Sequence, residues 1–261
     1  MMDASTNEGL PAVVDRATWQ AEVDALRVRE KAHTRAGDAL AAARRRLPMV
    51  ALDPAIALVG PRGPVTLLEA FEGRKQLIAY YFMWHAGHPA AAQCEGCTFF
   101  TGQVRELSML HSRDATFAVF CQGPYAESAR YRDFMGWDLP WYSAQDSLAA
   151  LLPGRQDGLM HLASYLRDGD RVYETYATTR RGVEAMDNSY RLLDLTAYGR
   201  QGDWEDSPAG WPRWSGDPVR KDGRPLAQWA RLAAGHSDDL GTGVIARPGE
   251  ADTAADGHCC H

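Results

Sequence analysis

The residues most able to do chemistry are two cysteines separated by two residues, Cys94 and Cys97, in the segment QCEGCTFF. The run Gln76–Trp84 before them is nearly continuously apolar, which is typical of a central strand buried on both faces. After them, apolar residues from Phe99 to Leu110 recur at helical spacing. Cys94 is therefore expected at a helix N-terminus, where free N–H groups and the helix dipole favour a thiolate. The pattern predicts reversible disulfide exchange, in which Cys94 attacks and Cys97 resolves.

Two other interpretations of this pair stay open. The cysteines could pack as reduced thiols, or they could form half of a metal site, with His85 and His88 close upstream as further ligands. The surroundings of the pair shift the thiol pKa in opposite directions. Glu95 between the cysteines raises it and disfavours a thiolate, whereas the helix terminus and a protonated His85 or His88 lower it and favour one.

The elements that must position the pair alternate between strands and helices. Ala115–Phe120 is predicted as a second core strand, and Ser128–Met135 as a helix that ends at Gly136. Met160–Leu166 and Arg171–Tyr176, with Asp-Gly between them, predict a β-hairpin. This alternation predicts an α/β layer structure with a parallel crossover.

The flanks of this core carry further helix signals. A helix is predicted from Thr18, as N-cap, to about Arg46, where Pro48 stops it, and a closing helix is predicted over Gly182–Leu193. The predicted organisation is a flexible segment 1–14, a helical extension 15–48, a main domain 49–198, an irregular arm 199–234 and a flexible tail 235–261.

Composition excludes several classes of protein. A net charge of −6 argues against a general nucleic-acid binder. No stretch approaches the ~18 apolar residues that a membrane span needs. The N-terminal segment has acidic residues and no hydrophobic core of a secretory signal, so a cytoplasmic protein is expected. Five cysteines in 261 residues are too few for a secreted disulfide scaffold, and in a reducing compartment a C-x-x-C is more often catalytic or metal-binding.

Six segments together resemble the domain-of-unknown-function 899 family, a thioredoxin-like group. They are RRRLPMV (44–50), YYFMW (80–84), QCEGCTFF (93–100), MGWDLPW (135–141), YLRDGDRVYETYAT (165–178) and YRLLDLTAYGRQ (190–201). The resemblance implies a thioredoxin-like fold, with a central mixed sheet flanked by helices, to which this chain adds an N-terminal helical extension and an irregular C-terminal arm. It also implies a dithiol–disulfide role.

One departure from the thioredoxin pattern bears on the substrate. Thioredoxins place a cis-proline before the strand that faces the cysteines, but no proline lies near Leu159–His161. This leaves room for a small-molecule disulfide, a peroxide or a dedicated partner. The residues expected to contact substrate are Trp84, as a lid over the sulfurs, His85, His161, and Arg180 or Arg181 as a charge partner.

The sequence thus predicts a thiol–disulfide oxidoreductase that uses Cys94 and Cys97 on an unidentified dithiol, disulfide or small-molecule substrate. It needs no organic cofactor, because electrons move between dithiols, and no metal is assigned. The alternative is a non-redox thioredoxin-fold scaffold that binds a small ligand or a metal. Cys121 is expected in the core, and Cys259 and Cys260 lie in the terminal sequence GHCCH, a cluster of soft ligands.

Overall fold

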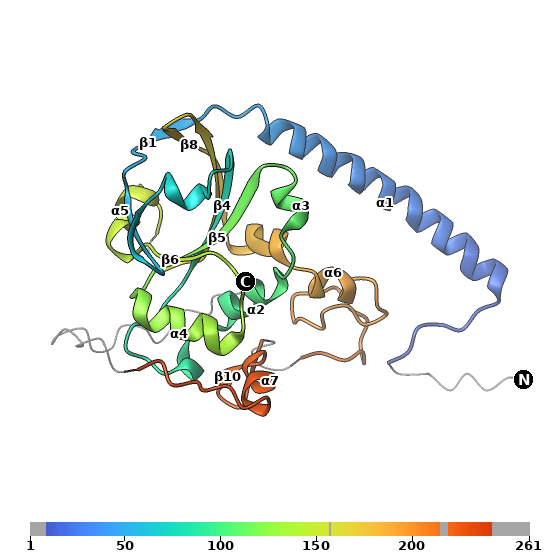
Figure 1. Cartoon of the computed structure of the whole chain (residues 1–261). Coiled ribbons are helices and arrows are strands. Elements are labelled where there is room, and N and C mark those ends of the chain that lie inside the picture. The colour runs from blue at the N-terminus through green and yellow to red at the C-terminus, as the bar shows by residue number, and fades with distance from the viewer. Residues whose placement is uncertain (1–8, 157, 215–218, 242–261) are drawn as a thin grey trace, which may run out of the picture. The chain divides into compact units, whose positions relative to one another are not determined.

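The computed structural model describes residues 9–156, 158–214 and 219–241 (Figure 1). These residues fall into two compact units, one formed by 49–188 with the segment that begins at 219, the other by the N-terminal 48 residues with 189–218. Cys259, Cys260 and most of the two segments predicted to be flexible lie outside the described residues. The domain boundaries proposed from the sequence stay a prediction.

The larger unit is built on an eight-stranded sheet with the strand order β1-β8-β7-β4-β5-β6-β2-β3. The strands are β1 (Val50–Leu52), β2 (Ala57–Gly60), β3 (Gly63–Thr66), β4 (Gln76–Phe82), β5 (Ala115–Cys121), β6 (Trp141–Ser143), β7 (His161–Asp168) and β8 (Arg171–Thr179). A separate two-stranded sheet pairs β9 (Arg220–Lys221) with β10 (Arg224–Pro225).

The middle of this sheet is mixed. Strand β4 pairs in parallel with β5 on one side and antiparallel with β7 on the other, and β7 and β8 form the hairpin predicted from Asp-Gly. Helix α2 (Glu95–Gln103) connects β4 to β5, and α4 (Tyr125–Met135) follows β5 and ends at Gly136, which adopts the left-handed conformation with φ 64°. A parallel β–α–β unit beside an antiparallel hairpin is the predicted thioredoxin-like α/β arrangement, and it is confirmed.

The two faces of the sheet bury separate cores, because successive side chains of a strand point to opposite faces. Tyr80 and Phe82 of β4 lie in one core, which also contains Cys94, Cys97 and residues of α2 and α4. Tyr81, between them, lies in the second core with residues of η1 (Glu69–Phe71) and α5 (Leu148–Leu151). Strand β5 is buried along its whole length, as its continuous apolar sequence predicts.

Short helices complete the larger unit. They are η2 (Ala90–Ala92), α3 (Ser108–His111), η3 (Gln145–Ser147), η4 (Arg180–Met186) and α7 (Gln228–Ala233). The prediction of one closing helix over Gly182–Leu193 is wrong: η4 ends at Met186, Asp187 is extended, and α6 (Ser189–Leu193) begins separately. Extended backbone at Asp187 interrupts the helical hydrogen bonds.

The smaller unit contains α1 (Arg16–Arg44), a helix of 29 residues that lies where the sequence predicts one. Its N-cap is Asp15 rather than the expected Thr18, because the Asp15 carboxylate accepts hydrogen bonds from the Thr18 N–H at 2.8 Å and from its hydroxyl at 2.9 Å. The backbone N–H of Thr18, in the first turn of α1, is thus capped by the Asp15 side chain. In the same unit the Tyr198 hydroxyl donates to the carbonyl of Gly9 at 2.7 Å.

No helix in the described part of the chain is both long enough and apolar enough to cross a membrane.

Candidate active site around Cys94 and Cys97

Cys94 is the N-cap residue of α2, in the position that the sequence predicts. Its Sγ accepts a hydrogen bond from the backbone N–H of Cys97 at 3.3 Å, which supplies a partner for one of the free amides at the helix start. The Cys97 Sγ in turn accepts from the N–H of Met83 at 3.3 Å, just after β4. Both cysteines are reduced, and the Met83 Sδ lies 3.9 Å from the Cys94 Sγ.

Both thiols are buried, with exposed fractions of 4% for Cys94 and 0% for Cys97. The hydrogen bond with the Cys97 thiol, burial and the negative charge of Glu95 raise the pKa of Cys94 well above its usual value, whereas the Cys97 N–H acts in the opposite direction. The opposing influences expected from the sequence therefore leave the Cys94 thiol protonated at neutral pH. Reaction requires this pair to become accessible and to lose a proton.

The side chain of Gln93 closes the loop that leads from β4 to Cys94. This fully buried amide accepts from the His85 N–H at 3.0 Å and donates to the carbonyls of His85 and His88 at 2.8 and 3.1 Å. The His85 ring is half-buried, and burial together with the nearby His88 lowers its pKa. Neutral His85 cannot supply the positive charge that would favour a thiolate.

Trp84 is anchored by a carboxylate from α4. Its indole Nε1–H donates to Glu127 at 3.0 Å, and the same oxygen accepts from the N–H of Gly87 at 3.1 Å. Gly123 lets the indole pass close to the backbone, because a Cβ at that position would lie 1.9 Å from Trp84 Cδ1. Glu127 is 3% exposed, so these hydrogen bonds satisfy a buried charge.

A chain of hydrogen bonds links α7 to Cys94. Thr98 donates its only hydroxyl proton to the Cys94 carbonyl at 2.7 Å, so the Tyr131 hydroxyl, 2.6 Å away, must donate to Thr98. The Tyr131 oxygen then accepts from the Gln228 Nε2, at 2.7 Å, and Gln228 also donates to the Ala90 carbonyl at 2.8 Å. Each proton position follows from the donors available, and every bond of the chain is buried.

A second residue of the C-terminal segment 219–241 also reaches the start of α2. The Arg220 guanidinium donates to the carbonyls of Ala91 and Gln93 at 2.8 and 3.2 Å and to the Glu95 carboxylate at 2.8 Å. It therefore holds the backbone on the N-terminal side of Cys94 and the charged side chain that follows it.

His161, which is expected at the substrate site, lies on the opposite face of the sheet from the thiols. His161 pairs with Tyr81 across β4 and β7, its ring is 6.4 Å from the Tyr81 ring, and Tyr81 belongs to the core on the other face of the sheet. The residue of this region that lies in the core of the cysteines is Met160, at 3.9 Å from the Tyr80 hydroxyl. No cis peptide occurs in the described residues, in agreement with the missing proline.

Arg180 and Arg181 open η4 with exposed side chains. Arg180 has the left-handed φ of 52°, and the Arg181 Nε donates to Glu184 at 2.7 Å. The same helix packs Val183 and Met186 into the core that holds the cysteines. Substrate contacts by Trp84, His85, His161 and the two arginines stay predictions.

The sequence analysis missed most of the polar residues that support the pair. They are Gln93, Glu127, Tyr131, Arg220 and Gln228. Gln93 directly precedes Cys94 in the segment QCEGCTFF, but the other four are far apart in the chain and belong to no short motif. Met160 could have been placed from the sequence. Side chains along a strand alternate between the two faces of the sheet, so Met160 lies on the opposite face from Ala163.

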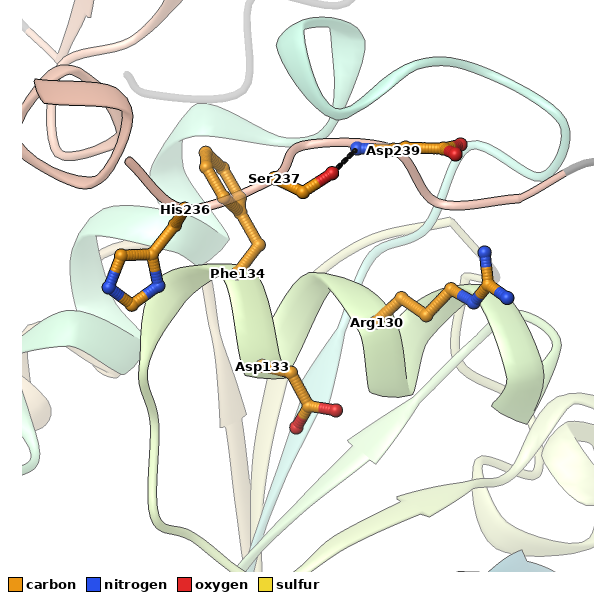
Figure 2. Close-up of a pocket in the computed structure, with 6 residues that line it drawn as sticks. All are labelled: Arg130, Asp133, Phe134, His236, Ser237 and Asp239. Atoms are coloured by element: carbon orange, nitrogen blue, oxygen red, sulfur yellow. Dashed lines mark hydrogen bonds between the residues drawn. The ribbon is translucent and has the colours of Figure 1, made fainter. Parts of the chain in front are cut away.

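A polar depression of about 370 Å³ lies elsewhere on the larger unit (Figure 2). In Figure 2, Arg130, Asp133 and Phe134 come from α4, and His236, Ser237 and Asp239 come from the irregular segment that passes over it. The lining contains one arginine and two carboxylates, and neither Cys94 nor Cys97 is part of it.

Among the described residues, no group of three or more His, Cys, Asp or Glu side chains could hold a metal ion.

The family comparison gives one match over most of the chain. Residues 8–218 match the family model described as "Bacterial protein of unknown function (DUF899)". The chain belongs to the DUF899 family. No curated protein sequence matches this DUF899 protein.

Several solved structures resemble part of the DUF899 protein. Peroxidoxin BcpB from Mycobacterium tuberculosis is 19% identical, with 51% of this chain and 86% of that chain covered and a TM-score of 0.35. A mutant of peroxiredoxin Q from Xanthomonas campestris is 15% identical, with 54% and 92% covered and a TM-score of 0.37. A mutant of peroxiredoxin 6 from Arenicola marina is 14% identical, with 61% and 80% covered and a TM-score of 0.36.

Proposed function

We propose that the DUF899 protein is a thiol–disulfide oxidoreductase that works through Cys94 and Cys97. The observation that carries the proposal is the position of Cys94 as N-cap of α2, with its Sγ on the N–H of Cys97 and the Cys97 side chain in the first turn of the same helix. A cysteine in this position gains stabilisation of its thiolate from the helix start, and the second thiol is close enough to resolve a mixed disulfide.

The reaction balances without a cofactor. The Cys94 thiolate attacks one sulfur of a substrate disulfide, forms a mixed disulfide and releases the other sulfur as a thiolate. The Cys97 thiolate then attacks the Cys94 Sγ and releases the second substrate thiolate. Two electrons pass from the protein dithiol to the substrate, and the two protons lost by the cysteines neutralise the two substrate thiolates. In the reverse direction the protein disulfide oxidises a dithiol.

The test is a redox titration of the purified full chain in thiol–disulfide buffers, with each cysteine-containing peptide identified by mass after alkylation. The expected result is one two-electron transition shared by Cys94 and Cys97, within roughly −150 to −300 mV, and absent in Cys97→Ser. Cys121→Ser is the matched control, because Cys121 is buried in β5 and should leave the transition unchanged.

The alternative is a non-redox scaffold, and one observation favours it: both thiols are buried. In that case the pair stays reduced throughout the titration, and the oxidoreductase proposal is abandoned.

A further inference from the structure

The Arg220 side chain makes four hydrogen bonds, three of them at or just before the start of α2. One terminal nitrogen donates to the carbonyls of Ala91 and Gly223 at 2.8 and 2.9 Å, and the other donates to the Gln93 carbonyl at 3.2 Å and to Glu95 at 2.8 Å. Both side chains of the ion pair are about three-quarters buried, with exposed fractions of 26% for Arg220 and 23% for Glu95. A partly buried pair of this kind is screened less by solvent than a surface pair.

The carboxylate that Arg220 contacts lies at a sensitive place. Glu95 is the residue between Cys94 and Gly96 in the C-x-x-C, in the first turn of α2. Besides the Cys97 hydrogen bond and burial, its charge raises the pKa of the Cys94 thiol. A guanidinium on this carboxylate offsets that charge, whereas Glu95 without the guanidinium would oppose the thiolate more strongly.

We propose that Arg220 is the positioning residue of the C-x-x-C: it offsets the charge of Glu95 and holds the backbone before Cys94, so that the Cys94 thiolate can form. This role rests on the proposed function and deepens it, because it assigns control of the thiol to the C-terminal segment. Arg220 acts through Glu95 and the loop carbonyls, and it makes no contact with either sulfur that the structure records.

The test is the pH dependence of Cys94 alkylation in the reduced full chain, measured by peptide mass for wild type, Arg220→Gln, Glu95→Gln and the double variant. Arg220→Gln is expected to move the profile up by roughly 0.5 to 1 pH unit, which lowers the rate about three- to tenfold at a fixed pH. Glu95→Gln is expected to move it down. The double variant is expected within about twofold of wild type, because no unbalanced carboxylate remains.

Two controls distinguish the effect of the Arg220 charge from a general loosening of the C-terminal segment 219–241. Arg224→Gln removes a neighbouring arginine that binds Asp238 at 3.0 Å and Gln228 at 3.2 Å, not Glu95, so it should leave the profile in place. Arg220→Lys keeps the charge and should stay close to wild type, which also covers the case in which Arg220→Gln does not fold.

Acceleration of alkylation in Arg220→Gln overturns the proposal, because it means that Arg220 only closes the site. A double variant as slow as Arg220→Gln also overturns it, because the slower reaction then does not come from the charge of Glu95. An upward shift in Arg224→Gln equal to that of Arg220→Gln also overturns it. Alkylation reports the thiolate and needs no redox turnover, so this result is independent of the redox titration that tests the function itself.

Discussion

The Tyr131 hydroxyl joins α7 to the start of α2, and its removal tests the hydrogen-bond chain. In Tyr131→Phe the ring stays in the aromatic core, where it lies 6.1 Å from Phe82 and 5.8 Å from Trp137, so packing is retained. Thr98 keeps its bond to the Cys94 carbonyl, and Gln228 keeps its bond to Ala90. The loss is therefore two buried hydrogen bonds and one N–H of Gln228 left without a partner.

The cost follows from these losses. A buried hydrogen bond contributes about 1 kcal/mol net, and a buried donor left unpaired costs about 1–3 kcal/mol. Since Gln228 is 0% exposed, water cannot replace the phenol without rearrangement. We expect a decrease of about 2–3 kcal/mol in the free energy of unfolding, which at an m-value of roughly 2 kcal/mol/M lowers the urea midpoint by about 1 M.

The assay is urea unfolding of the reduced protein, followed by tryptophan fluorescence. The matched control is Tyr125→Phe in the same helix, because the Tyr125 hydroxyl makes no hydrogen bond recorded within the described residues. That control should change the free energy by less than about 0.5 kcal/mol. Equal midpoints for the two variants would show that the chain from Gln228 to Cys94 contributes nothing to stability, and the reasoning would be refuted.

Three further predictions concern packing, pH and the second face of the sheet. Gly123→Ala should displace the indole of Trp84, which would otherwise lie 1.9 Å from the new Cβ, and should red-shift tryptophan emission; an unchanged spectrum would contradict this. Burial raises the pKa of Cys121 from 9.0 to about 12, so the folded state retains a proton that the unfolded state loses. The stability that this thiol contributes is complete below about pH 9 and is lost as pH rises toward 12, so Cys121→Ala should lose less stability than wild type between these values in alkaline denaturation. His161→Gln should leave the rate of Cys94 alkylation within about twofold of wild type, because its ring faces the other core; a tenfold change would place it at the thiols.

Local sequence determined the elements that carry the pair. Three local patterns predict these elements: the apolar run before the cysteines, the helical spacing after them, and the Asp-Gly of the hairpin. Each pattern spans only about ten residues, so it can be recognised without knowledge of the tertiary structure. Cys94 at the start of α2 follows directly from that order. The sequence alone does not distinguish Asp15 from Thr18 as the N-cap of α1, because both residue types cap helices; only the observed hydrogen bond distinguishes them.

Tertiary structure decided how the pair is held. Gln228 and Arg220 lie more than a hundred positions from Ala90 and Glu95, and no periodicity relates residues at that separation. Their contacts arise because the C-terminal segment lies over the start of α2, where free carbonyls and a carboxylate need donors. The Cys97 hydrogen bond, burial and the charge of Glu95 raise the pKa of the Cys94 thiol, and burial is a property of the folded chain rather than of the residue type.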